Sequence, residues 1–277
     1  MRRDLMTRYV AVLLLLVFAA VVPNDASAQG AAAPGPASGG AVDPALIADL
    51  VAANHILTDQ AVLDGFGHVS VRHPGNPQRF LMSRSLAPAL VKADDIMEYD
   101  LDGQAVDARG RASFLERFIH AEIYRARADV MAVVHSHSPA VIPFGATQAQ
   151  LRPMYHISAF LSPGAPVFDI RKTAGMTNML VGDSSIGKAL AAALGDASVV
   201  LMRGHGNVVV ASSLPLAVFR AIYTETNAKI QAQAMALGGP ITFLDPEEAA
   251  KANKVLEQIH LRAWDLWKRA ALEKAGK

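Results

Sequence analysis

Three histidines stand at spacings that suit metal chemistry. His135 and His137 follow an apolar run at residues 130–134, and positions i and i+2 of a strand project from the same face. His205 lies between two glycines in a predicted tight turn, where the missing side chains let another group approach. Three imidazoles provide the protein half of an open Zn²⁺ or Mn²⁺ site and leave positions for a substrate.

A carboxylate is the natural fourth member of such a site, and Glu116 is the candidate. Its spacing also suits a local role, because Ser113 and Glu116 form a Ser-x-x-Glu pattern before a helix. In a capping box the serine accepts from the helix N-terminus while the glutamate bonds back to the serine amide. Spacing alone favours the capping box for Glu116.

The composition excludes several other kinds of site. The 277-residue chain has no cysteine, so disulfides, zinc fingers, iron–sulfur ligation and thiolate nucleophiles are excluded. No P-loop, G-x-G-x-x-G segment or nucleophile elbow occurs. Twenty-six basic and 25 acidic side chains leave a formal charge of +1 with no dense basic run, so nucleic acid is not an expected partner.

The N-terminal segment predicts export. Arginines precede an apolar run at residues 10–22, which is followed by Ala-Ser-Ala at 26–28, the order of a secretory signal peptide. The run is too short for a membrane span, which needs roughly 20 residues. We therefore expect a signal peptide at 1–28, a flexible linker at 29–42, a domain at 43–277, and a periplasmic protein without a membrane span. If the segment is not used, the protein is expected in the cytoplasm.

Periodicity predicts a mixture of helices and hairpin-connected strands. Helices are expected at 44–65, 113–127 and 215–237 and from 246 onward, and strands at 68–72, 79–82, 130–134, 198–202 and 208–210. This order favours an α/β fold in which helices pack on a mostly antiparallel sheet.

The chemically active segments resemble one known family. A glutamate that opens a helix at 116–124, His-Ser-His at 135–137 and Arg-Gly-His-Gly at 203–206 follow one another as in the class II aldolase/adducin family. Similar segments at 67–71 and 99–103 extend the resemblance to residues 45–237.

The resemblance implies a fold, an assembly and a site. It implies a three-layer α/β/α fold, a homo-tetramer, and one divalent ion, Zn²⁺ or Mn²⁺, on His135, His137 and His205. It also implies that Glu116 lies beside the ion and shuttles a proton, which reverses the preference for a capping box.

Within the family, the chain looks closest to decarboxylases of hydroxylated aromatic acids. Sugar-phosphate aldolases carry Gly-Asn-Val-Ser and a Thr-rich phosphate turn, whereas this chain has Gly-His-Val-Ser at 67–70 and Met-Ser-Arg-Ser at 82–85. Decarboxylation and aldol cleavage both break a C–C bond and need a sink for the electron pair, which a Lewis acid provides. The expected activity is that of a carboxy-lyase acting on a small aromatic or heteroaromatic carboxylate. A retro-aldolase (an aldehyde-lyase) acting on a hydroxy-carbonyl compound and a non-enzymatic adducin-like module are the alternatives.

Five further residues are candidates for binding the substrate. Arg84 suits a second carboxylate, because its planar guanidinium can pair with one through two bonds. Ser83, Ser85 and His68 are candidates for the same rim. Tyr155 lies beside His156, where aldolases of the family place a His-Tyr pair used in acid catalysis.

Overall fold

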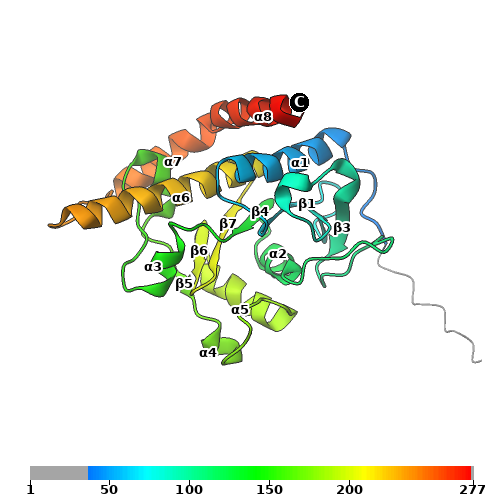
Figure 1. Cartoon of the computed structure of the whole chain (residues 1–277), viewed down its shortest axis with the longest axis horizontal. Coiled ribbons are helices and arrows are strands. Elements are labelled where there is room, and N and C mark those ends of the chain that lie inside the picture. The colour runs from blue at the N-terminus through cyan, green and yellow to red at the C-terminus, as the bar shows by residue number, and fades with distance from the viewer. Residues whose placement is uncertain (1–36, 276–277) are drawn as a thin grey trace, which may run out of the picture. The chain divides into compact units, whose positions relative to one another are not determined.

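A computed structural model describes residues 37–275, and these residues form one mixed sheet with helices packed against it (Figure 1). The sheet has seven strands in the order β3-β2-β1-β4-β7-β6-β5. Only the β5–β6 pair is parallel, so the prediction of a mostly antiparallel sheet is confirmed. The strands are β1 (His68–Arg72), β2 (Arg79–Ser83), β3 (Ile96–Asp100), β4 (Ala132–Ser136), β5 (Val167–Phe168), β6 (Val199–Met202) and β7 (Gly206–Ala211).

Helices connect and cover these strands. The α-helices are α1 (Pro44–Asp59), α2 (Arg117–Ala126), α3 (Ile142–Ala146), α4 (Arg171–Ala174), α5 (Ser184–Leu194), α6 (Leu214–Leu237), α7 (Pro246–Ile259) and α8 (Leu261–Ala275). Short 3₁₀ turns occur at Pro88–Leu90, Ala93–Asp95 and His156–Leu161. Asp43 and Ser213 cap α1 and α6 with their side chains, and a proline lies in the first turn after each cap, as is usual at helix starts.

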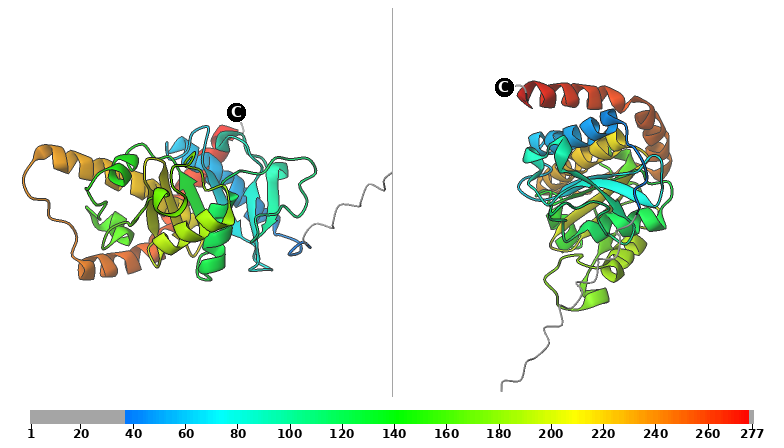
Figure 2. Two further views of the ribbon diagram at one scale, coloured as in Figure 1. Left: turned by 90° about the horizontal axis from the view of Figure 1, so that it is seen from below. Right: turned by 90° about the vertical axis from the view of Figure 1, so that its right-hand side faces the viewer.

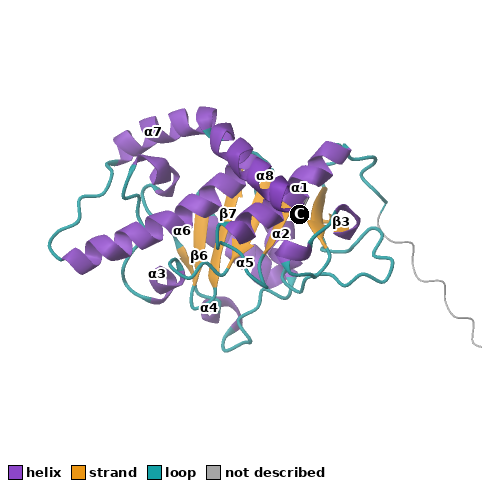
Figure 3. Cartoon of the chain, turned by 45° about the horizontal axis from the view of Figure 1, so that its top comes forward, coloured by secondary structure: helices purple, strands orange, loops and turns teal. Residues whose placement is uncertain are grey.

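The two faces of the sheet are buried against different helices (Figures 2 and 3). Val134 of β4 packs in a core with α1, α6 and α8, while Val133 packs in a second core with α2 and α5. Alternation along the strand produces this division. Val69 of β1 faces the first core, so His68 and Ser70 point toward α2, as does His135 of β4.

Arg72 fixes the C-terminal end of α2 to the sheet. Its buried guanidinium donates to the carbonyl oxygens of Tyr124 and Arg127 at 2.8 Å and of Val130 at 2.9 Å. It also lies over the Tyr124 ring, 4.7 Å from the centroid. A cation that bonds the last carbonyls of a helix is favoured there by the helix dipole. Arg72 therefore holds the helix whose opposite end carries Glu116.

Several element boundaries differ from the sequence predictions. The first helix, α1, ends at Asp59 rather than near residue 65. Helix α2 begins at Arg117 rather than at 113, and β4 runs from 132 to 136 rather than from 130 to 134, so His135 lies within the strand. The last helix is divided at His260 into α7 and α8, and α8 packs on α1 and α6. Periodicity is continuous across this break, which explains why the pattern did not predict it.

We correct the prediction of an exported, periplasmic protein, because no signal peptide is supported. The segment 1–28 lies outside the described residues. Within residues 37–275 no helix is long and apolar enough to cross a membrane. The prediction rested on an order of residue types, and composition alone does not establish that a peptidase cuts the chain.

Part of the predicted linker contacts the domain. Residues 37–42 belong to the described chain, and there Ser38 and the Gly39 amide donate to the Glu98 carboxylate at 2.7 and 2.6 Å. The Arg79 side chain donates to the Ala37 carbonyl at 3.0 Å. The hydrogen-bonded part of the fold therefore begins upstream of residue 43.

We predict that Gly187→Ala destabilises the protein, although alanine is normally favoured over glycine within a helix by roughly 0.5–1 kcal/mol. A Cβ at position 187 of α5 would lie 2.6 Å from the Phe118 carbonyl oxygen of α2. The expected loss of unfolding free energy is about 1–3 kcal/mol, measured by urea denaturation. Lys188→Ala, an exposed position on the same helix, is the control and should be neutral. A Gly187→Ala protein as stable as wild type would contradict this account of the α2–α5 contact.

Candidate metal centre

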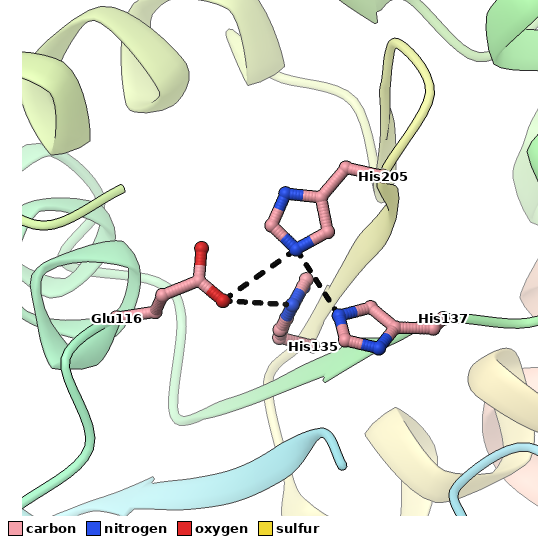
Figure 4. A group of neighbouring side chains, drawn as sticks. All are labelled: Glu116, His135, His137 and His205. Carbon is pink, nitrogen blue, oxygen red and sulfur yellow. Dashed lines mark hydrogen bonds and ion pairs between the residues drawn. The ribbon is translucent and has the colours of Figure 1, made fainter. Parts of the chain in front are cut away.

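The structure brings Glu116, His135, His137 and His205 together from three separate parts of the chain (Figure 4). Glu116 precedes α2, His135 lies in β4, His137 directly follows β4, and His205 occupies the turn between β6 and β7. One ligand atom from each residue can be chosen so that all four lie within 4.8 Å of one another. Figure 4 shows the four side chains pointing toward a common centre.

Backbone carbonyls fix how two of the imidazoles face the centre. His135 Nδ1 donates to the Asn207 carbonyl oxygen and His205 Nδ1 to the Met179 carbonyl oxygen, both at 3.1 Å. Metal ligation requires neutral imidazoles, and with their single N–H at Nδ1 each Nε2 presents a lone pair. Outer hydrogen bonds of this kind orient histidines that ligate metals.

The centre has strongly perturbed proton affinities. Burial by itself raises the pKa of Glu116, but the adjacent imidazoles of His135 and His205 lower it more, so this pKa lies well below its usual range. Burial lowers the pKa of His205, whereas Glu116 raises it more, and the net shift is upward. Burial, followed by the charges of His135 and His205, lowers the pKa of His137 to about 4. Glu116 is therefore ionised and His137 neutral at pH 7.

The donor set fits a divalent ion. Buried His135 Nε2 has no hydrogen-bond partner among the described residues, and it lies 3.5 Å from Glu116 Oε2. An unpartnered buried nitrogen costs about 1–3 kcal/mol, and a cation would satisfy it. Imidazole nitrogens with one carboxylate oxygen are ligands that Zn²⁺ and Mn²⁺ accept. The cluster can therefore hold a divalent metal.

The local interpretation of Glu116 as a capping residue is wrong. Glu116 occupies the N-cap position of α2, but its side chain makes no capping hydrogen bond. Its Oε1 accepts instead from the Val181 backbone N–H at 2.9 Å, and its Oε2 lies 3.5 Å from His205 Nε2. The helix N-terminus still favours the ionised carboxylate.

A cavity of about 430 Å³ opens beside the cluster. Glu116, His137, His68 and Ser85 are its titratable or hydroxyl-bearing lining residues. The other side-chain walls are apolar: Phe66, Leu86, Ala87, Phe114, Leu115 and Leu180. Within the described chain, no Lys or Arg lines this cavity. It therefore combines apolar walls with a few polar groups and no cationic Lys or Arg side chain.

The predicted substrate-binding residues are distributed unevenly around this cavity. His68 and Ser85 line it, whereas Ser83 and Arg84 do not, and the Arg84 Nε donates to Asp95 Oδ1 at 2.6 Å. Tyr155 is also absent from its lining, and burial raises the pKa of Tyr155 to about 12. Roles for Ser83, Arg84 and Tyr155 in substrate binding remain predictions.

Sequence reasoning missed some of the cavity walls. Phe114 was not among the predicted site residues, yet its ring contacts His68 at a centroid distance of 4.6 Å and lines the cavity. Phe66 and Leu180 come from loops outside the recognised motifs. Their place in the cavity wall was not predictable from helical or strand periodicity, because loops have neither.

Comparison with known proteins identifies one family and several relatives of this chain. The profile of the Class II Aldolase and Adducin N-terminal domain matches residues 48–232. "Decarboxylase tropJ" of Talaromyces stipitatus is 40% identical over 238 residues, covering 78% of this chain and 90% of the relative. A 3,4-dihydroxyphthalate decarboxylase of Arthrobacter keyseri is 32% identical over 71% of this chain and 81% of its own length. A crystal structure of an aldolase II superfamily protein from Pseudomonas syringae, 26% identical, matches 84% of this chain and 95% of its own with a TM-score of 0.71.

We predict that acid destabilises the metal-free protein partly through His120. Burial, followed by the charge of His135, lowers the pKa of this imidazole to about 3. Between its ordinary value near 6.5 and this folded value, the unfolded chain binds a proton that the folded chain does not. The unfolding free energy therefore falls as the pH drops, by roughly 2 kcal/mol at pH 5 from this group.

The measurement is urea unfolding in EDTA at pH 7.5 and pH 5, for wild type and His120→Gln. The variant should lose about 2 kcal/mol less between these pH values. Exposed His156, changed to Gln, serves as the control and should behave like wild type. An equal loss in all three proteins would show that His120 is not held neutral in the fold.

We predict that His205→Ala loses most of its metal. The substitution removes one of the four ligand groups, and affinity for Zn²⁺ or Mn²⁺ should weaken by at least about tenfold, the lower range seen even for outer-shell changes. Metal per subunit, measured by plasma mass spectrometry after dialysis, checks this. His55→Ala is the matched control, because the ring of His55 bonds to the Val91 carbonyl, outside the cluster. Full metal content in His205→Ala would show that His205 is not a metal ligand.

Proposed function

This chain belongs to the class II aldolase and adducin family, and we propose that it is a divalent-metal-dependent lyase that removes CO₂ from a hydroxylated aromatic or heteroaromatic carboxylate. The observation that carries the proposal is the placement of the Glu/His₃ cluster at the edge of an apolar cavity. Apolar walls suit an aromatic ring, and the cluster suits its oxygen substituents. Both relatives are named as decarboxylases, and the name of the second, a 3,4-dihydroxyphthalate decarboxylase, points to the same class of substrate.

The described lining of the cavity offers no cationic Lys or Arg side chain to a sugar phosphate. A phosphate group carries up to two negative charges and is usually bound by Arg, Lys or a series of backbone amides. Among the described cavity residues there is no Lys or Arg. A planar carboxylate beside a divalent ion needs less cationic support from the protein, so decarboxylation is favoured over cleavage of a phosphorylated aldol.

The proposed ligands are His135, His137 and His205, and the proposed metal is Zn²⁺ or Mn²⁺. When bound there, a divalent ion provides a Lewis acid for the electron pair that remains on the ring when CO₂ leaves. The ligand histidines contribute neutral, oriented nitrogens, because carbonyl oxygens accept their other ring N–H groups at His135 and His205. Membership of the family supports two further parts of the proposal, a three-layer α/β/α arrangement and a homo-tetrameric assembly.

Glu116 is the proposed proton carrier. Its carboxylate is ionised in the free protein, so it can accept the proton of the substrate hydroxyl as the acid binds. It then delivers this proton to the ring carbon whose bond to the carboxyl carbon breaks. The hydroxyl proton ends on the ring carbon, the electron pair of the broken bond is used in the new C–H bond, and CO₂ is released. The Val181 N–H holds the other carboxylate oxygen and keeps the group aimed at the cavity.

We predict that Glu116→Gln keeps the fold but loses at least about a hundredfold in turnover, the usual range for general acid–base catalysis. The amide oxygen can still accept from the Val181 N–H, so thermal stability should change little. The assay follows CO₂ release from 3,4-dihydroxyphthalate and from 2,3-dihydroxybenzoate, with metal content measured on the same preparation.

Glu122→Gln is the matched control. Glu122 is a buried carboxylate on the same helix, and it accepts from Ser184 Oγ at 2.7 Å rather than contacting the cluster. Its turnover should remain near that of wild type. Near-normal turnover in Glu116→Gln would show that Glu116 does not carry the proton. Release of an aldehyde from a hydroxy-carbonyl compound, with no CO₂ from any aromatic acid, would instead favour the retro-aldolase.

A further inference from the structure

A buried chain of hydrogen bonds leads from the core to the cavity. Tyr124 OH lies 2.8 Å from Ser70 Oγ, Ser70 Oγ lies 2.6 Å from His120 Nδ1, and His120 Nε2 lies 2.6 Å from His68 Nδ1. All four side chains are buried. His68 is the last member and lines the cavity next to Glu116.

This chain of hydrogen bonds forms because polar residues recur at matching spacing on β1 and on α2. His68, Ser70 and Arg72 alternate on the face of β1 that turns toward α2, while the other face of β1 carries Val69 and Val71. His120 and Tyr124 stand one turn apart on α2, four residues from each other. The polar stripe of the strand therefore meets the polar stripe of the helix along its whole length.

The direction of these bonds follows from counting hydrogens. A hydrogen bond joins His120 Nε2 to His68 Nδ1, so one of these two nitrogens accepts and is unprotonated. Because both rings are buried without a carboxylate in the chain, each is counted as neutral with one N–H. The two hydroxyls and two rings together own four hydrogens, and three bonds use three of them. One hydrogen is left over, either on one of the two buried hydroxyls, Tyr124 or Ser70, or on His68 Nε2.

The two ends offer very different surroundings to that hydrogen. If it stays on the Tyr124 hydroxyl without a partner, it is buried, because within residues 37–275 the Ser70 hydroxyl is the one side-chain acceptor in reach of this group. A buried unsatisfied donor costs about 1–3 kcal/mol. If it lies on His68 Nε2, it is open to the cavity, since this nitrogen is not among the enclosed atoms that lack a partner. The second arrangement leaves no donor enclosed without an acceptor.

We propose that Tyr124, Ser70 and His120 hold His68 as its Nε2–H tautomer, so that His68 donates a hydrogen bond to a carboxylate oxygen of the acid bound in the cavity. This inference rests on the proposed function for the identity of the ligand. His68 touches the substrate, whereas His120 and Ser70 are positioning residues that act through it. The absence of Lys and Arg from the described lining gives this N–H its importance, because few other donors are available to the carboxylate.

The tautomer can be read directly by long-range ¹H–¹⁵N correlation spectra of ¹⁵N-histidine-labelled, zinc-loaded protein, with the His68 signals assigned from their loss in His68→Gln. We expect a protonated Nε2 and an unprotonated Nδ1 in the wild type. Addition of salicylate, the probe acid, should move the Nε2 signal, whereas phenol, which has no carboxylate, should not. A protonated Nδ1 in the resting protein would overturn the proposal.

Two substitutions among the hydrogen-bonded residues test where the spare hydrogen lies. Ser70→Ala breaks the link to His120 and should give a mixture of His68 tautomers with salicylate affinity weakened about threefold to tenfold. Tyr124→Phe removes a buried hydroxyl from the same chain, yet the spare hydrogen still lies on His68 Nε2 in the arrangement that leaves no buried donor on Ser70 without a partner. It should therefore keep the wild-type tautomer and bind salicylate within twofold. A tautomer unchanged in Ser70→Ala, or altered in Tyr124→Phe, would contradict the positioning role.

A pair of substitutions at His68 separates the donor from the bulk of the ring. The Gln amide nitrogen reaches approximately the place of Nε2, whereas the Asn amide reaches only that of Nδ1. We expect His68→Gln to retain salicylate affinity within about threefold and His68→Asn to lose tenfold or more, measured by calorimetry. Equal salicylate affinities of His68→Gln and His68→Asn would show that His68 does not donate a hydrogen bond to the acid. Since these readings are made on resting or probe-bound protein, they stand apart from the CO₂ assay, whose failure alone would contradict the proposed function.

Discussion

The register of β4 within the sheet is the constraint on which the candidate site depends. β4 is central, with His135 opposite His68 of β1 on one side and opposite Val208 of β7 on the other. Since side chains alternate along a strand, a slip of one residue would turn His135 toward the α1 and α6 core and bring a valine toward α2. Burial of both faces of the sheet makes such a slip costly, because apolar side chains would lose their packing on both sides.

Close backbone approach ties the third histidine to the same register. Gly206 begins β7 directly after His205, and a Cβ at this position would collide with the Ser136 carbonyl oxygen. The missing side chain lets the β6–β7 turn lie against the end of β4. His205 Nε2 consequently lies 3.1 Å from His137 Nε2. The glycine therefore serves the geometry of the cluster as well as the turn.

Electrostatics at the site and packing around it are linked through α2. The helix begins beside Glu116, whose charge is stabilised by neighbouring histidines despite burial, and it ends in carbonyls held by Arg72. Between these ends it carries His120 and Tyr124 of the buried chain, while Gly187 of α5 packs tightly on its other side. A shift of this one helix would move the carboxylate, the hydrogen-bonded chain and part of the cavity wall together. Such shared support is how a folded scaffold keeps polar groups preorganised.

The sequence by itself determined the features that depend on local period and on residue type. Alternation predicted that His135 and His137 share a face, the absence of cysteine restricted the ligands to nitrogen and oxygen, and hairpin signals predicted an antiparallel sheet. These inferences succeed because strand geometry and side-chain chemistry are local properties. The resemblance to the class II aldolases added the grouping of the cluster, which spacing could not provide.

Only the tertiary structure decided which distant groups meet. Glu116 has a plausible local partner in Ser113, yet its carboxylate accepts from Val181, 65 residues away. The neighbouring His135 and His205 stabilise its charge there by more than burial disfavours it. Likewise, nothing in the spacing of His68, Ser70, His120 and Tyr124 indicates one hydrogen-bonded chain. It forms because β1 and α2, about 50 residues apart in sequence, are packed face to face, and buried polar groups must then satisfy one another.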